Sequence, residues 1–230
     1  SDSVDHNRIS TGAKDDMDYA TVEQVAPLAK RMGATVFTLD DGWQVVRPDD
    51  SGWSLTDRPG SLRLSTLAGG ETGTTNTGKN VFVRTNTPES DWTAEASVDA
   101  PDLSADFQQV GLDAYVDDDN YVKVDLGWID GRRAIEMVVE NAGKVVTRTS
   151  VPYDGDSAHL RLVRRGDDVT AEYSSDDTDW FEVGTGSVAG AARVALQAIG
   201  GSEAPPVVKT YVDKVDVRTS GNLVARSVTV

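Results

Sequence analysis

The stretch FQQVGLDAYVDDDNYVKVDLGWI, residues 107–129, decides the fold. Val110, Leu112 and Ala114 alternate with glycine and polar residues, and the alternation resumes after the turn DDDN at residues 117–120. A period of two on both sides of a turn predicts an antiparallel hairpin with strands at 106–116 and 121–129. One face of this hairpin would be apolar and the other polar, with Gln109, Asp113, Tyr115, Tyr121, Lys123 and Asp125 on the polar face.

The same alternation of apolar and polar residues continues on both sides of the hairpin. In WQVVRPDDSGWSLTDRPGSLRLST, residues 43–66, short strands alternate with the turn residues Pro, Asp and Gly. Further strands are predicted at 35–39, 80–85, 92–99, 134–141, 144–150, 159–165, 168–174, 179–183, 193–199, 208–218 and 222–229. Many short strands at regular spacing predict an all-β sandwich or barrel.

One helix is predicted, over residues 21–32. Val22, Val25, Leu28 and Met32 follow helical spacing, and Pro27 lies inside the pattern. Residues 1–34 are therefore predicted to be a polar tail plus this helix, and residues 35–230 to be the lectin-like β-sandwich.

Composition limits the partners of the chain. The formal net charge of −16 would repel nucleic acid and anionic membranes, so neither is an expected partner. The absence of cysteine excludes disulfides, thiol nucleophiles and thiolate-bound metals. A soluble acidic chain fits a secreted or extracellular setting, and the start SDSVDHN suggests a piece of a longer protein.

The polar face of the hairpin has the residue types of a sugar site. Aromatic rings stack on pyranose rings, while carboxylates, amides and lysine hydrogen-bond the hydroxyl groups. The alternative is an ordinary solvent-facing sheet with cross-strand ion pairs. Trp43 and Trp53 flank a turn and are further candidates for ligand contact, as exposed platforms, whereas Trp92 and Trp128 are assigned to the core.

The same face also permits a catalytic interpretation. Glycoside hydrolases use two carboxyl groups, which Asp113, Asp125, Glu136 and Glu140 could supply. With 38 acidic residues a coincidental pair is expected, and no ExDxxE spacing is present. The histidines, His6 and His159, join no catalytic motif.

A cation is a third possibility for the turn at residues 117–120. Clustered oxygen ligands on a tight turn suit calcium, but EF-hand spacing is absent, and a solvated turn is the simpler interpretation. A structural calcium elsewhere at the edge of the sandwich stays open, and no other cofactor is expected.

Three blocks of sequence carry a family resemblance: WSLTDRPGSLRLST, NVFVR at residues 80–84, and FQQVGLDAYVDDDNYVKV. In this order they resemble the concanavalin A-like C-terminal domain of family 43 β-xylosidases and arabinofuranosidases, over about residues 43–218. The resemblance implies a two-sheet jelly roll that accompanies a catalytic domain, and it places Gln108, Gln109, Tyr115 and Tyr121 on a central sheet.

A second resemblance covers about residues 15–47. MDYATVEQVAPLAKRMGATVFTLDDGWQ resembles a helix-then-strand unit of the α-galactosidase-type (β/α)8 barrels. That resemblance implies sugar contacts by Asp40, Asp41 and Trp43. A chain of 230 residues with this strand pattern cannot hold the remaining barrel, so the alternative is that these residues form the first strands of the sandwich.

Three functions follow from these patterns. We expect a non-catalytic carbohydrate-binding or accessory module of a polysaccharide-degrading enzyme, with a glycan and a catalytic domain as partners. The alternatives are a sandwich glycoside hydrolase and a structural domain that packs on a catalytic domain. Exposed aromatics in a groove would favour binding, a carboxylate pair with a raised pKa would favour catalysis, and a flat face with paired charges would favour the structural role.

Overall fold

The computed structural model describes residues 42–74, 76–89, 91–201, 203 and 205–219. Its elements are β1(Trp43–Val46), η2(Asp50–Gly52), β2(Trp53–Ser54), β3(Leu62–Ser65), β4(Val81–Arg84), β5(Trp92–Asp99), β6(Gln109–Asp117), β7(Asn120–Ile129), β8(Arg132–Asn141), β9(Lys144–Pro152), β10(Ser157–Arg165), β11(Asp168–Ser174), β12(Phe181–Ser187), β13(Arg193–Ile199) and β14(Lys209–Thr219).

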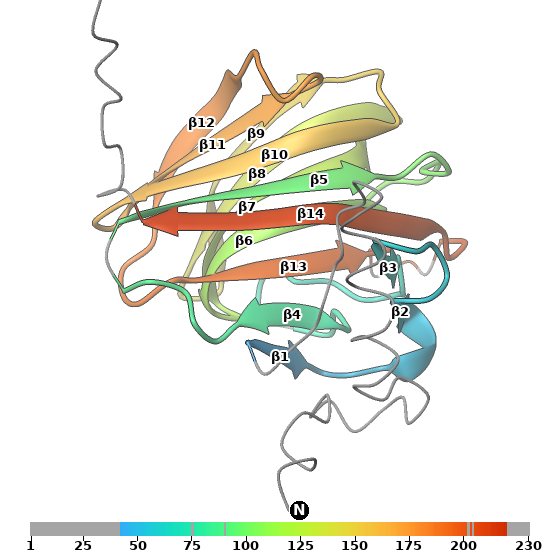
Figure 1. Ribbon diagram of the computed structural model, residues 1–230, viewed down its shortest axis with the longest axis horizontal. Helices are drawn as coiled ribbons and strands as arrows, with labels where there is room; N and C mark the ends of the chain where they lie inside the picture. Colours follow the sequence, from blue (N-terminus) through green and yellow to red (C-terminus); the bar gives the residue numbers. More distant parts are fainter. Residues whose placement is uncertain (1–41, 75, 90, 202, 204, 220–230) are drawn as a thin grey trace, which may run out of the picture.

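The strands form two layered sheets of seven strands each (Figure 1). Sheet A has the order β1-β4-β13-β6-β7-β8-β9, and sheet B the order β12-β11-β10-β5-β14-β3-β2. All of the paired strands in both sheets are antiparallel. The predicted all-β sandwich of two antiparallel sheets is confirmed. Within the described part of the chain, no helix is long and apolar enough to span a membrane.

The hydrophobic core lies between the two sheets. The apolar residues of the hairpin, such as Leu112 and Val124, are fully buried there against Leu160 and Leu162 of sheet B. Since successive strand residues point to opposite faces, the polar residues of β6 and β7 lie on the outer face of sheet A, away from this core.

The predicted strands match the structure closely. The bounds of β5, β11 and β13 are those expected, whereas the two-residue β2 was not predicted and β12 extends to Ser187. The predicted strands at 35–39 and 222–229 and the predicted helix at 21–32 lie outside the described residues.

Trp53 differs from its predicted place. It is 2% exposed and packs edge-on against Phe82, with ring centroids 5.6 Å apart. The expected exposed platform is wrong at this position because β2 turns the indole into the core rather than toward solvent. Trp92 is buried as predicted, and Trp128 is partly buried against the core.

Candidate functional site

The predicted polar residues come together on the outer face of sheet A. In the register of β6, β7 and β8, Asp113 pairs with Lys123, Tyr115 with Tyr121, and Asp125 with Glu136. Glu140 lies opposite Tyr121 at the end of β8. Gln197 comes from the neighbouring strand β13. We call this set, together with Gln109 and Glu71, the outer-face cluster.

The cluster is buried, which the sequence did not lead us to expect. Asp113, Lys123, Asp125, Glu136 and Glu140 are each at most 2% exposed. Tyr115 and Tyr121 are 7% and 2% exposed, so they form no open aromatic platform. The alternative of an ordinary solvent-facing sheet is therefore wrong for this part of the face, because these side chains are buried.

A loop covers part of this face, and we call residues 69–74 and 76–78 the covering loop. Its two limbs meet where the Gly70 carbonyl accepts hydrogen bonds from the amides of Thr77 and Gly78, both at 3.0 Å. Its far end reaches β8, where the Gly73 amide donates to both oxygens of Glu140 at 3.1 and 3.0 Å. Asn76 Nδ2 donates to Asp119 Oδ1 at 2.8 Å.

Lys123 is at the centre of the cluster. Its Nζ donates to Gln109 Oε1 and lies 3.3 Å from Asp125 Oδ2 and 3.8 Å from Glu71 Oε2. Burial alone would lower the pKa of Lys123, but Asp125, Glu71 and Asp113 outweigh this effect and raise it. The lysine is therefore a buried ammonium ion held by carboxylates from a sheet and a loop.

Asp125 lies against two glycines. A Cβ at Gly111 would come 2.7 Å from the Asp125 Cβ and 2.5 Å from the Val124 carbonyl oxygen, and a Cβ at Gly127 would come 3.2 Å from Asp125 Oδ1. The space beside Gly111 is thus needed by the Asp125 side chain and by the neighbouring strand.

Several polar atoms of the cluster remain without a hydrogen bond. Both oxygens of Asp125, both of Glu71 and one oxygen of Asp113 are buried without a hydrogen-bond partner among the described residues. The same holds for both side-chain atoms of Gln197, although this amide lies close enough to Asp113 to lower its pKa slightly. Because unsatisfied buried polar groups are rare and costly, this concentration makes the cluster the candidate functional site.

Burial also changes the acidity of the carboxyl groups. It raises the pKa of Asp113 well above its ordinary value, and it raises those of Asp125 and Glu140. Burial, followed by the charge of Asp125, raises the pKa of Glu136 to about 7, and burial raises that of Glu71 to about 7. The cluster is therefore partly protonated at neutral pH and can both donate and accept hydrogen bonds.

We expect Glu71→Gln to stabilise the protein at alkaline pH. The unfolded chain releases the Glu71 proton near pH 4.5 and the folded chain near pH 7, so the folded state holds more protons between these values. The contribution of Glu71 to the free energy of unfolding therefore falls as the pH rises from 4.5 to about 7. Glutamine cannot ionise, and the variant should gain about 3 kcal/mol in free energy of unfolding at pH 8 and little at pH 4. Urea unfolding at both pH values checks this, and equal effects at both would contradict it.

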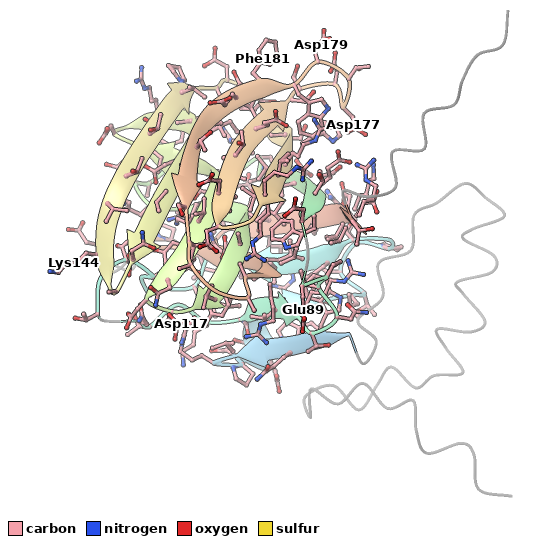
Figure 2. The ribbon with its side chains drawn as sticks, turned by 90° about the vertical axis from the view of Figure 1, so that its left-hand side faces the viewer. Glu89, Asp117, Lys144, Asp177, Asp179 and Phe181 are labelled. Atoms are coloured by element: carbon pink, nitrogen blue, oxygen red, sulfur yellow. The ribbon has the colours of Figure 1, made fainter. Side chains whose placement is uncertain are left out.

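The turn between β6 and β7 does not have free carboxylates. Asp118 pairs with Arg47 and accepts a hydrogen bond from the Tyr115 hydroxyl at 2.8 Å. Burial alone would raise the pKa of Asp118, but these two partners outweigh burial and lower it. Asp117 accepts from the Asp119 amide and from Asn120 Nδ2, and Asp117 and Lys144 mark neighbouring turns in Figure 2. In the described residues no group of three or more His, Asp or Glu side chains is arranged to hold a metal ion. The carboxylates of this turn are thus used by contacts within the chain, and a calcium ion, here or elsewhere on the sandwich, stays a prediction.

The remaining predicted contacts lie elsewhere. Trp43 is on β1, the edge strand of sheet A, and is partly buried against the core. Asp40 and Asp41 lie outside the described residues. His159 shares a 2.9 Å hydrogen bond with Ser97 on sheet B, which gives it a structural contact.

Sequence reasoning missed two members of the cluster, Glu71 and Gln197. Glu71 lies in a glycine-rich segment that looked like a loose loop, and no local pattern shows that it folds over a sheet. Gln197 had a usable signal, because it is a polar residue at an alternate position of an apolar strand.

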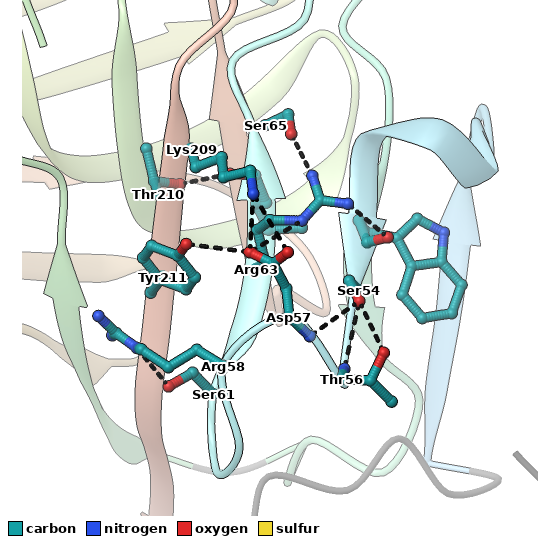
Figure 3. Close-up of polar contacts among 12 residues, drawn as sticks. Ser54, Thr56, Asp57, Arg58, Ser61, Arg63, Ser65, Lys209, Thr210 and Tyr211 are labelled. Carbon is teal, nitrogen blue, oxygen red and sulfur yellow. Dashed lines mark hydrogen bonds and ion pairs between the residues drawn. The ribbon is translucent and has the colours of Figure 1, made fainter. Parts of the chain in front are cut away.

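On sheet B, the charged residues around Asp57 and Arg58 are paired with one another. In Figure 3, Asp57 accepts hydrogen bonds from Lys209 Nζ at 3.1 and 3.2 Å and from the Tyr211 hydroxyl at 3.0 Å. Arg58 lies 3.9 Å from the centre of the Tyr211 ring and pairs with Asp99 and Asp213. These contacts hold the segment before β3 on the sheet.

Comparisons with known proteins identify the fold and the family. The family described as "Beta xylosidase C-terminal Concanavalin A-like domain" matches residues 37–195. A search of curated proteins found no match.

Solved structures show the same fold. The GH43 protein BlXynB from Bacillus licheniformis is 24% identical with a TM-score of 0.69, over 78% of this chain and 37% of that one. The Bacteroides ovatus xyloglucan PUL GH43B has the same identity and TM-score, over 80% of this chain and 38% of that one. The chain thus spans less than two-fifths of these proteins. A functionally unknown Saccharomyces cerevisiae protein is 18% identical with a TM-score of 0.62, over 78% of this chain and 97% of that one.

These matches also decide between the two resemblances. The family match begins at residue 37, and Trp43–Val46 pairs with β4 as part of sheet A. The resemblance of residues 15–47 to a (β/α)8 barrel unit has no support, and from Trp43 onward these residues belong to the sandwich.

Proposed function

Because the chain belongs to the β-xylosidase C-terminal concanavalin A-like domain family, we propose that it is the accessory module of a glycoside hydrolase and binds a glycan at the outer-face cluster. The observation that carries this proposal is the group of buried oxygens of Asp113, Asp125 and Glu71 that accept no hydrogen bond among the described residues, although Asp125 and Glu71 are ion-paired with Lys123. Such atoms take hydrogen bonds from sugar hydroxyls, and they lie beside two tyrosines.

The proposal requires the covering loop to move. The side chains of the cluster are at most 8% exposed, and Gly73 and Glu71 of the loop contact Glu140 and Lys123 directly. A glycan would replace these loop contacts with its own hydroxyl groups. The loop lies outside the named strands and carries four glycines in the described residues, so its displacement leaves the strand ladders of both sheets intact.

A screen of the chain against glycans and polysaccharides tests the proposal, with release of reducing sugar measured for every glycan that binds. Binding without release supports the module. Release of sugar would support the hydrolase alternative instead, which is favoured by one observation: the pKa of Glu136 near 7 suits a general acid. Absence of binding would contradict glycan recognition by this face and leave a domain that packs on a catalytic partner.

We expect Asp113→Asn to lower the affinity of the chain for the glycan found by this screen about tenfold or more. A carboxylate that accepts a ligand hydrogen bond contributes about 1.5–3 kcal/mol, and an amide keeps the size of the side chain but loses the charge. Asp216→Asn is the matched control, since Asp216 lies on β14 of sheet B and pairs with Arg218. Calorimetric titration of both variants checks this, and equal affinities would remove Asp113 from the site.

A further inference from the structure

The outer-face cluster holds more negative than positive groups. Five carboxyl groups, those of Glu71, Asp113, Asp125, Glu136 and Glu140, are buried around the single ammonium of Lys123. If every group were ionised, the formal charge would be −4. Buried charges of one sign cost free energy, so the cluster must hold protons or receive a cation.

The arginines nearest to the cluster offset only part of this charge. Arg148 approaches Glu136 at 3.5 Å from the exposed end of the cluster. Arg47 is occupied by Asp118 and by the Gly78 carbonyl oxygen. Asp113 and Asp125 therefore share the single ammonium of Lys123, and both oxygens of Asp125 and one oxygen of Asp113 accept no hydrogen bond among the described residues.

The placement of the oxygens suits an organic cation better than a metal ion. They come from β6, β7, β8 and the covering loop, and no three of these carboxyl groups are arranged as metal ligands in the described part of the chain. A protonated amine has three N–H donors that can reach separate single oxygens, and neighbouring hydroxyl groups can use the remaining acceptors.

We infer that the glycan recognised at this face carries a protonated amino group, as in a 2-amino-2-deoxy sugar. This inference rests on the proposed function and names the ligand class of the same site. The ammonium is held by Asp113 and Asp125, and the ring hydroxyls by Gln197 and Glu71. Glycans with carboxylate or sulfate groups are rejected by the same charge.

Proton release distinguishes this ligand from a neutral sugar. Carboxyl groups of the cluster keep protons at neutral pH because they are buried, and a cation that enters favours their ionised form. Binding of the amine therefore expels protons into the buffer. A neutral sugar exchanges hydrogen bonds without this release.

The experiment compares oligosaccharides of glucosamine with N-acetylglucosamine oligosaccharides of the same length, and with xylo-oligosaccharides. Titration calorimetry at about pH 6, in two buffers of different ionisation enthalpy, measures affinity and proton release together. We expect the amine to bind at least tenfold more tightly than its acetylated counterpart, with an enthalpy that depends on the buffer and an affinity that falls with salt.

Two variants separate the site from the general negative charge of the chain. Asp125→Asn and Asp113→Asn should each remove most of the preference for the amine, whereas Asp216→Asn, which changes the net charge equally, should keep it. Circular dichroism confirms that each variant is folded.

The outcomes are distinct. Equal or tighter binding of a neutral sugar would overturn the inference and leave the proposed function in place. If both Asp113→Asn and Asp125→Asn keep the preference for the amine, that preference reflects the overall charge of the chain, and the inference is overturned. Absence of binding by all the oligosaccharides would overturn both the inference and the proposed function.

Discussion

Lys123→Met is expected to lower the free energy of unfolding by about 3–5 kcal/mol at pH 8, because it leaves buried carboxylates without their cation. Lys123 is 2% exposed and lies 3.3 Å from Asp125 and 3.8 Å from Glu71, while methionine fills a similar volume with no charge. At pH 5 the loss should be smaller, since the raised pKa values of Glu71, Asp113 and Glu136 leave them protonated. Urea unfolding at both pH values measures the difference.

Lys209→Met is the matched control for this prediction. Lys209 pairs with Asp57 on the outer face of sheet B, but its side chain is 56% exposed, and such a surface pair contributes little. A loss at Lys123 no larger than that at Lys209 would show that the cluster does not depend on its lysine.

A disulfide between the covering loop and the β6–β7 turn should abolish glycan binding. Asn76 and Asp119 are joined by a side-chain hydrogen bond of 2.8 Å, and the chain has no cysteine, so Asn76→Cys/Asp119→Cys offers one pair only. If the loop must leave the cluster for a glycan to enter, the oxidised variant should bind at least tenfold more weakly than the reduced one. The same calorimetric titration, before and after addition of dithiothreitol, checks this.

Asn76→Ser/Asp119→Ser controls for the loss of the native hydrogen bond. It should bind the glycan at least as well as the unaltered chain, in both redox conditions. Full affinity of the oxidised cysteine pair would contradict the opening of this loop and direct attention to another face of the sandwich.

Much of the fold was predictable because its signals are local. Alternation around residues 117–120 predicted the β6–β7 hairpin and placed Asp113 near Lys123 or Asp125, and the structure pairs Asp113 with Lys123. The turn residues between the other apolar runs placed the strands of both sheets. The family resemblance then supplied the two-sheet arrangement, which local pattern alone left open as sandwich or barrel.

The candidate site was predictable only in part, because burial of its polar face depends on distant residues. The alternation identified the members on β6, β7 and β8, but nothing around Glu71 shows that residues 69–74 fold back onto β8. The glycines at 111 and 127 were visible, yet their role became clear only when Asp125 was found between them. Trp53 was misplaced for a similar reason, since its packing on Phe82 joins segments far apart in the chain.

Hydrogen–deuterium exchange of the chain with and without a glycan that binds tests the central claim most directly. The account predicts that exchange changes at the amide of Gly73, which is bonded to Glu140 in the structure, and around Lys123 and Asp125 on β7. The segment held by Asp57 on sheet B serves as the internal reference and should not change. Protection confined to sheet B, with the covering loop and β7 unaffected, would contradict the placement of the glycan site on the outer face of sheet A.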